Sequence, residues 1–327
     1  MSEPRGRSSQ KVVVSEFLHE AALQLLGAGG GLHYDPELYA RPDELRAALQ
    51  DAGALLVRNQ TKVTRSLLEG TRVAAVGRVG VGLDNIELPA VQQAGVTVTW
   101  APGTNATSVA EYVIGSMLSL ARNFLVASPK LHAGEWDRQA AVGFELQGKT
   151  LGIVGLGDIG GRVARRAQVL GMRIVASDPL VGPNSSAVQE FGVELLTLEE
   201  LLAASDVVSL HAPLLPSTRG MIGQRALASM KPVAYLINTA RGGLVDESAL
   251  AQALKAGQLA GAALDVRDPE PPGSNDPLAG LPNVLLTPHI AGVTEESTKR
   301  ACLHVAEDVL RVLAGERPLS EVPAGAV

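Results

Sequence analysis

Cysteine and aromatic residues are scarce in this chain, and both shortages narrow what it can be. The single cysteine, Cys302, cannot form a disulfide within the chain or supply a cysteine cluster for zinc or an iron–sulfur centre. That usage is typical of a reducing compartment, so we expect a cytoplasmic protein. Phe, Tyr and Trp make up 3% of the 327 residues, which disfavours an aromatic cage or a base-stacking platform.

Long runs of one charge sign and long apolar runs are also missing. No run of about five Lys or Arg residues occurs, and the formal net charge is −6, so nucleic acid is not an expected partner. No stretch of about 18 uncharged apolar residues occurs, so we expect no membrane span. The histidines show no H-x-x-x-H or H-E-x-x-H spacing, and we expect no bound metal.

What the sequence does contain is a regular alternation of short apolar runs and helical periods. The chain is 46% hydrophobic, which is enough apolar material for two domain cores. From Lys11 onward, β-branched runs alternate with segments of helical period, which is typical of parallel α/β folds. The predicted strands of the first part are Lys11–Val14, Ala54–Val57, Val73–Val76 and Val96–Thr99, and its predicted helices are Glu20–Leu26, Asp43–Asp51, Val63–Glu69 and Leu88–Ala94.

A second part follows a break around Pro102 and Gly103. It begins with a long predicted helix, Ser108–Phe124, and ends with another, Glu295–Leu313, that has Thr294 as its N-cap and Gly315 just beyond its end. Its predicted strands are fully apolar, as in a parallel sheet covered on both faces: Leu151–Val154, Arg173–Ser177, Val207–Leu210, Ala234–Asn238, Ala260–Leu264 and Val284–Leu286.

A glycine-rich sequence lies between a predicted strand and a predicted helix. It reads Gly155-Leu156-Gly157-Asp158-Ile159-Gly160, which is the G-x-G-x-x-G pattern of dinucleotide-binding folds. Gly155 allows a tight turn, Gly157 lets the backbone approach a pyrophosphate, and Gly160 lets helix and strand pack closely. Asp158 and Ile159 begin the helix, whose N-terminus faces the phosphates.

Asp178 ends the next predicted strand, close to the spacing of about 20 residues expected of an acid that binds the adenosine ribose. A carboxylate there accepts hydrogen bonds from the ribose hydroxyls and repels a 2′-phosphate, so we predict NAD rather than NADP. A purely structural explanation is also possible, in which the glycines only form a tight turn and Asp178 only ends a strand. The order of strand, glycines, helix and acid favours the cofactor site.

Three polar residues follow later apolar strands, at the sheet edge where parallel α/β folds bind ligands. Arg241 offers a planar fork for a carboxylate. His289 is suited to proton transfer near neutral pH, and Glu270 can fix the histidine's tautomer and stabilise its protonated form. Each residue alone has an ordinary structural explanation, and it is their order and spacing that favour a catalytic site.

With these motifs the chain strongly resembles the D-isomer-specific 2-hydroxyacid dehydrogenase family, from about Val12 to Leu313. The resemblance implies that Arg241 binds substrate, that Glu270 and His289 form the catalytic pair, and that Asp265 contacts the nicotinamide half of the cofactor. Thr239, Ala240 and Gly292 are further predicted cofactor contacts. Two positions depart from phosphoglycerate enzymes of the family, which often carry threonine where this chain has Val81 and Ala212.

The resemblance also implies an architecture and an assembly. We predict an α/β fold of two doubly wound parallel-sheet domains, with a Rossmann NAD-binding domain, residues 103–292, inserted into a smaller flavodoxin-like substrate domain, residues 11–102 and 293–327. Residues 1–10 are predicted to be a disordered tail. A homodimer is implied as well, and the apolar Ser108–Phe124 and the segment to Trp136 favour it.

The implied reaction is hydride transfer between a D-type 2-hydroxy acid and its 2-keto acid, with NAD as cofactor. In the family, the backbone of Val79 and Gly80, after Arg78, holds the substrate carboxylate. Arg58 and Arg78 follow predicted strands and could meet a second anionic group on C3, as in sulfolactate or phosphoglycerate, although both could equally be structural. The alternatives are a glyoxylate or hydroxypyruvate reductase, and a corepressor-like protein that only senses NAD.

Overall fold

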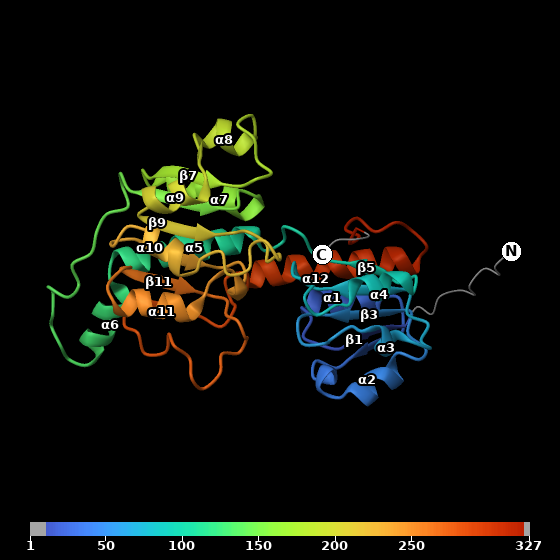
Figure 1. The fold of residues 1–327 in the computed structure, drawn as a ribbon. Coiled ribbons are helices and arrows are strands. Elements are labelled where there is room, and N and C mark those ends of the chain that lie inside the picture. Colours follow the sequence, from blue (N-terminus) through green and yellow to red (C-terminus); the bar gives the residue numbers. More distant parts are fainter. Residues whose placement is uncertain (1–10, 324–327) are drawn as a thin grey trace. The chain divides into compact units, whose positions relative to one another are not determined.

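The chain forms two compact units. A computed structural model describes residues 11–323, and the predicted N-terminal tail, residues 1–10, lies outside them. Of the described residues, one unit consists of 11–105 together with 293–323, and the other is Ala106–Gly292 (Figure 1). The assignment of substrate binding to the first unit and cofactor binding to the second stays a prediction.

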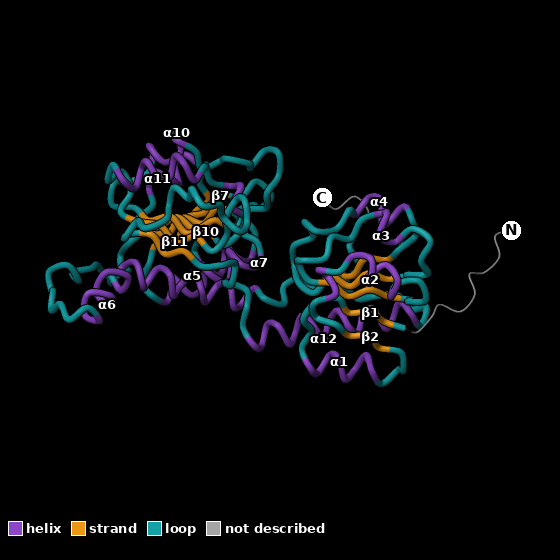
Figure 2. Tube along the Cα trace, turned by 90° about the horizontal axis from the view of Figure 1, so that it is seen from below, coloured by secondary structure: helices purple, strands orange, loops and turns teal. Residues whose placement is uncertain are grey.

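The smaller unit is built on a five-stranded parallel sheet in the order β2-β1-β3-β4-β5. Helices cover both faces, with α1 and α12 on one side and α2, α3 and α4 on the other (Figure 2). The strands are β1 (Val12–Val14), β2 (Leu32–Tyr34), β3 (Ala54–Val57), β4 (Ala75–Arg78) and β5 (Thr97–Thr99). The helices are α1 (Glu20–Gly27), the 3₁₀ turn η1 (Leu38–Ala40), α2 (Pro42–Ala48), α3 (Arg65–Leu68), α4 (Leu88–Gln93) and α12 (Glu295–Leu313).

Helix α12 packs closely against β4 although more than 200 residues separate the two in the chain. A Cβ at Gly77 would lie 2.6 Å from the Val305 side chain, so glycine permits this approach. The predicted ends of α12 are confirmed: the Thr294 side chain accepts from the Ser297 N–H, and Gly315 has a φ of 79° just beyond the helix. The close packing fixes the strand that leads to Arg78.

The larger unit contains a seven-stranded parallel sheet in the order β12-β11-β10-β9-β6-β7-β8. One face carries α9, α10 and α11, and the other carries α5 and α7 (Figure 2). The strands are β6 (Thr150–Val154), β7 (Arg173–Ser177), β8 (Glu194–Leu195), β9 (Val207–Leu210), β10 (Tyr235–Asn238), β11 (Gly261–Leu264) and β12 (Val284–Leu286). The helices are α5 (Ala106–Ala121), α6 (Phe124–His132), α7 (Asp158–Val169), α8 (Ser186–Phe191), α9 (Leu198–Ala204), α10 (Gln224–Ser229), the 3₁₀ turn η2 (Gly242–Leu244) and α11 (Glu247–Lys255).

These two strand orders confirm the predicted α/β class. The larger sheet runs outward in both directions from β6, which is the doubly wound arrangement of dinucleotide-binding folds. The strand order therefore reverses between β6 and β9, and ligands of such sheets bind outside the carboxyl ends of the strands at that point.

The long helix predicted to end at Phe124 ends earlier, at Ala121. Its last carbonyl accepts from the Phe144 N–H, and Asn123 has a left-handed φ of 51°, so the chain turns into a separate helix, α6. Within residues 11–323, no single helix is both long and apolar enough to cross a membrane. Helices α5 and α6 meet that criterion only as a pair, bent by 66°.

Candidate active site

The glycine loop after β6 has the geometry that the fingerprint predicts. Gly155 has a φ of 91°, and a Cβ there would lie 2.8 Å from the backbone of His211 and Ala212 at the end of β9. A Cβ on Gly160 would lie 2.2 Å from the carbonyl oxygen of Gly155. By contrast, a Cβ on Gly157 would meet open space, so this glycine leaves room on the ligand side of the loop.

Asp178 follows β7 and is bonded to this loop. Its Oδ2 accepts from the backbone N–H of Leu156, and its Oδ1 accepts from that of Leu180, both at 2.8 Å. The carboxylate is thereby fixed beside the glycines, with lone pairs left for further donors.

Arg241, Asp265 and His289 follow β10, β11 and β12, which are adjacent parallel strands, so all three lie at one edge of the sheet. Buried Asn238 shapes the first loop: its Oδ1 accepts from the Ala240 N–H and its Nδ2 donates to the Arg241 carbonyl. The Arg241 Nη1 donates to the Ala240 carbonyl at 2.7 Å. In the same loop, the Thr239 Oγ1 is buried and has no hydrogen-bond partner.

Glu270 and His289 are in direct contact. Glu270 Oε2 lies 2.8 Å from His289 Nδ1, and Glu270 Oε1 accepts from the Arg267 N–H at 2.8 Å. An ionised carboxylate can only accept hydrogen bonds, so the histidine donates from Nδ1 and its Nε2 is left for another partner. The two side chains are 38% and 52% exposed, which leaves them accessible to a small molecule.

Asp265 holds the loop that carries His289. The buried carboxylate accepts from the Thr287 hydroxyl and from the backbone N–H groups of Ile290 and Ala291, at 2.6–2.8 Å. Thr287 gives its one hydroxyl proton to Asp265, so the Tyr112 hydroxyl, 2.6 Å from Thr287 Oγ1, is the donor in that contact; burial raises the pKa of Tyr112. These bonds hold His289 in a left-handed conformation, with a φ of 55°.

In the smaller unit, Glu16 shapes the loop that contains Arg58. Its buried carboxylate accepts from four consecutive backbone N–H groups, those of residues 58–61, at 2.8–3.1 Å. The Arg58 guanidinium lies 5.6 Å from the centre of the exposed Phe17 ring. Among residues 11–323, no acidic side chain forms an ion pair with Arg58.

Arg78 ends β4, the neighbour of β3, so it lies at the same edge of the smaller sheet as Arg58. Its Nη1 donates to the Val79 carbonyl at 3.0 Å. Gly80 has a φ of 139°, and a Cβ there would lie 1.7 Å from Arg78 Nη1. Glycine therefore leaves the space that the guanidinium occupies, which ties Arg78 to the Val79–Gly80 turn.

Comparison with known proteins identifies the family. The model for the D-isomer specific 2-hydroxyacid dehydrogenase, NAD binding domain, matches residues 114–291. The chain belongs to this family. Its matched region is an NAD-binding domain, which confirms the predicted cofactor.

Two relatives and a solved structure support this placement of the dehydrogenase chain. The (S)-sulfolactate dehydrogenase of Chromohalobacter salexigens is 46% identical over 305 residues, which are 92% of this chain and 98% of that protein. The D-3-phosphoglycerate dehydrogenase of Methanocaldococcus jannaschii is 45% identical over 94% of this chain, but the match spans only 58% of that protein. The crystal structure of the TT0316 protein from Thermus thermophilus has a TM-score of 0.89 at 34% identity, covering 96% of this chain and 100% of that one.

The dehydrogenase residues fit an NAD molecule. The space beside Gly157 suits a pyrophosphate, Asp178 lies beside the glycines with acceptor capacity to spare, and the unpartnered Thr239 hydroxyl is a polar atom that needs a ligand. Asp158, Ile159, Ala240, Asp265 and Gly292 stay predicted contacts. Among the described residues, no cluster of three or more His, Cys, Asp or Glu side chains could hold a metal ion.

Three supporting residues of the dehydrogenase were not found from the sequence: Glu16, Asn238 and Thr287. Glu16 lies two residues after a β-branched run, and an acid so close to a strand end is the one signal that could have singled it out. Asn238 and Thr287 act through contacts made only in the folded chain, and no local pattern marks them.

His211, beside the glycine loop, is expected to make the stability of the dehydrogenase depend on pH. Burial lowers its pKa to about 4, and its Nε2 lies 2.9 Å from the Ser209 hydroxyl. The histidine of the unfolded chain binds a proton near pH 6.5, whereas that of the folded chain does so only near pH 4. Lowering the pH through this range therefore stabilises the unfolded state relative to the folded state. The free energy of unfolding should drop by up to about 3 kcal/mol between pH 6.5 and pH 4 from this group.

Urea unfolding at a series of pH values measures this contribution. His211→Gln should make the free energy of unfolding depend less steeply on pH over that range. A pH-independent change in stability caused by the substitution would not alter this slope. Parallel curves for the two proteins would contradict the assignment.

Proposed function

We propose that this chain is an NAD-dependent dehydrogenase that interconverts a D-type 2-hydroxy acid and its 2-keto acid. The observation that carries the proposal is the contact of Glu270 with His289 Nδ1, in the same unit as the NAD-binding loop. NAD, when bound, accepts the hydride from the hydroxy acid, and NADH returns it to the keto acid.

The chain's own residues bind the substrate and move its proton. Arg241 binds and polarises the keto acid. His289 gives a proton from Nε2 to the ketone oxygen during reduction and takes it back during oxidation. Glu270 accepts the hydrogen bond from Nδ1 and stabilises the imidazolium that forms on oxidation.

The proposed substrate carries a second anionic group on C3, of the sulfolactate or phosphoglycerate type. We assign its recognition to Arg58 and Arg78, and that of the common carboxylate to the backbone of Val79 and Gly80. Two relatives whose names contain such substrates support this assignment. Arg58 supports it as well, because no acidic side chain among the described residues forms an ion pair with it. The Phe17 ring beside Arg58 orders the guanidinium without cancelling its charge.

A panel of keto acids with NADH tests the activity and the substrate class together. Sulfopyruvate and phosphohydroxypyruvate should exceed hydroxypyruvate, glyoxylate and pyruvate in kcat/KM, and Arg58→Ala should reverse that order. If hydroxypyruvate or glyoxylate leads and Arg58→Ala leaves the order unchanged, the reductase alternative holds. A protein that binds NADH but reduces none of the panel would favour the NAD-sensing alternative.

Asp178 is expected to make NAD(H) preferred over NADP(H) by at least about 100-fold in kcat/KM, because a like charge at close range costs several kcal/mol. Asp178→Asn removes the charge but keeps one acceptor for the Leu156 N–H, so it should narrow the preference without freeing the loop. Glu190→Gln, on exposed α8, is a control for charge alone. Equal use of both cofactors by the unmodified enzyme would refute the role of Asp178.

We also propose that the enzyme is a homodimer that works in the cytoplasm, without nucleic acid or membrane partners. Large apolar side chains of α6 and the segment after it are exposed: Phe124, Leu131, Trp136 and Val142 at 54%, 57%, 80% and 65%. A second copy of the chain would cover them, and light scattering should give about twice 34.0 kDa. A mass near 34.0 kDa would contradict the dimer.

A further inference from the structure

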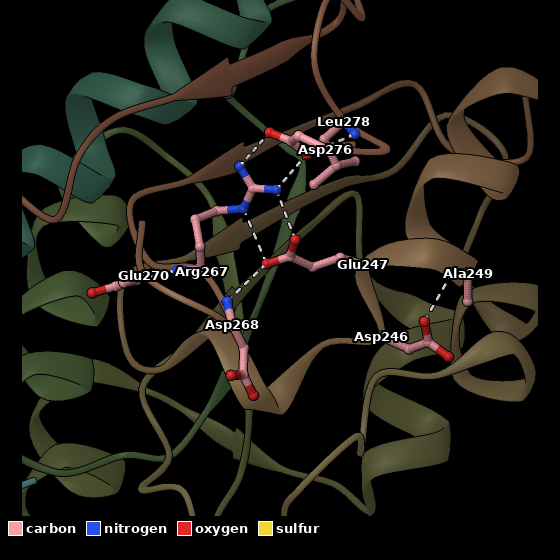
Figure 3. A network of polar contacts seen from close by, with 8 residues as sticks. All are labelled: Asp246, Glu247, Ala249, Arg267, Asp268, Glu270, Asp276 and Leu278. Atoms are coloured by element: carbon pink, nitrogen blue, oxygen red, sulfur yellow. Dashed lines mark hydrogen bonds and ion pairs between the residues drawn. The ribbon is translucent and has the colours of Figure 1, made fainter. Parts of the chain in front are cut away.

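Arg267 is an almost fully buried cation placed between two carboxylates. Its guanidinium is bonded to Glu247 through Nε and Nη2, at 3.0 and 2.7 Å, and to Asp276 through Nη1 and Nη2, at 3.0 and 2.6 Å (Figure 3). The side chain of Arg267 is 7% exposed, and those of Glu247 and Asp276 are 14% and 12% exposed. Both pairs have the two-bonded fork geometry that fixes a guanidinium in place.

The main chain of Arg267 reaches the proposed catalytic pair. Its N–H donates to Glu270 Oε1 at 2.8 Å, while the other oxygen, Oε2, meets His289 Nδ1. The next amide, that of Asp268, donates to Glu247 Oε1 at 3.2 Å. Two acids thus fix the side chain of Arg267, and the backbone N–H of Arg267 in turn binds Glu270.

Neither stability nor chemistry accounts for this cluster by itself. Well-packed apolar side chains can stabilise a protein as well as a buried ion cluster does, so stability alone gives no reason for burying three charges. The two acids use the guanidinium nitrogens Nε, Nη1 and Nη2, so Arg267 does not serve as a further substrate anchor. What the cluster provides is a fixed direction for the 267–268 backbone.

We infer that Arg267, anchored by Glu247 and Asp276, is a positioning residue that holds the Glu270 carboxylate against His289. The inference rests on the proposed function for its kinetic consequence but not for its geometry. With the anchor in place, Glu270 Oε2 keeps the histidine proton on Nδ1 and leaves Nε2 for the substrate. Without it, the half-exposed Glu270 carboxylate turns to water, and the pair loses its alignment.

Arg267→Met is the direct test, because it keeps an unbranched side chain and removes the guanidinium. A small misplacement of a catalytic group lowers the rate by up to about 100-fold, so kcat should fall by about 10–100-fold with little change in the dissociation constant of NADH. Arg267→Lys keeps the charge and one acid contact, and should restore part of the rate.

A double-mutant cycle separates positioning from general structural damage. If Arg267 acts through Glu270, Arg267→Met should change kcat by no more than about twofold when Glu270→Gln is already present. Arg219→Met is the matched control. It removes a cation that pairs with Asp268 Oδ2 on the exposed side of the same segment, at 3.0 Å, and should leave kcat unchanged. Equal losses from Arg267→Met in both backgrounds would overturn the inference.

Removing one cation from between two buried acids can prevent folding. The triple substitution Arg267→Met, Glu247→Gln and Asp276→Asn keeps the side-chain volumes similar and removes all three charges. Its kcat is measured with and without Glu270→Gln, as in the double-mutant cycle. A triple variant that retains the native kcat would overturn the inference, and one that loses rate only when Glu270 is intact would support it.

An NMR measurement decides the geometry even if no keto acid of the panel is reduced. In protein labelled with ¹⁵N-histidine, the Nδ1 proton of His289 gives a hydrogen-bonded resonance that is absent from His289→Asn. It should persist in Arg219→Met and be lost from Arg267→Met and from Glu270→Ala, which leaves no side-chain acceptor for Nδ1. Its persistence in Arg267→Met would overturn the positioning role, whereas an inactive protein with the expected spectra would overturn the proposed function alone.

Discussion

Replacing His289 with alanine is expected to lower kcat by about 10²–10⁴-fold, the usual loss when a general acid–base is removed. The structure gives the reason at the level of atoms. Nδ1 is committed to Glu270, so Nε2 is the one ring atom left to exchange a proton with the substrate oxygen. Stopped-flow or steady-state measurements with NADH and the preferred keto acid provide the rate, and NADH fluorescence provides the dissociation constant.

Two controls make the His289 result specific. His33→Ala removes an exposed histidine on the edge strand β2 and should leave the rate unchanged. Glu270→Gln removes the carboxylate charge beside Nδ1 but keeps an oxygen that can accept from it, so kcat should fall by less than in His289→Ala. A His289→Ala enzyme with a kcat near the native value would overturn the proposed mechanism.

The cofactor half of the site could be predicted because its determinants are local. Gly155, Gly157 and Gly160 are required by backbone geometry within one turn, and the flanking strand and helix are visible as apolar periods. Asp178 follows from spacing alone. The edge strands were harder: β2 and β8 were not predicted, because three and two half-exposed residues carry too little periodicity.

The residues proposed to react were singled out from the sequence, whereas the residues that hold them in place were not. Glu270 and His289 stand out by chemical type and by their place after apolar strands. The Arg267 cluster joins Glu247, at the start of α11, to Arg267 and Asp276 in the loop between β11 and β12, and none of the three stood out in the sequence. Contacts of this kind depend on which side chains the fold brings together, and a single sequence carries no periodic signal for them.

Asp265→Ala is expected to lower kcat nearly as much as His289→Ala, although Asp265 makes its hydrogen bonds to the loop and not to the imidazole. The carboxylate satisfies three donors of the loop, and leaving buried donors unpaired costs about 1–3 kcal/mol each. His289 also has a left-handed φ of 55°, which costs about 1–2 kcal/mol in the absence of such restraints. Without the carboxylate the loop relaxes and the imidazole leaves Glu270.

Comparison of Asp265 variants separates this restraint from direct cofactor binding. Asp265→Asn keeps an acceptor for Thr287 and Ile290 but places an amide against the Ala291 N–H, so its loss of rate should be smaller. Asp206→Ala is a matched control. Asp206 is likewise a carboxylate bonded to a backbone N–H, that of Thr150, and its side chain is 16% exposed, but it lies where β6 and β9 begin, at the opposite edge of the sheet.

Asp206→Ala should therefore lower the unfolding temperature without lowering kcat. If Asp265 acts through the loop, Asp265→Ala should reduce kcat far more than it weakens NADH binding, because the rest of the cofactor is proposed to be held by the glycine loop and Asp178. A loss that falls mainly on NADH affinity would instead assign Asp265 to the nicotinamide contact implied by the family. If Asp206→Ala lost as much kcat as Asp265→Ala, both losses would be explained by a less stable fold and not by the position of His289.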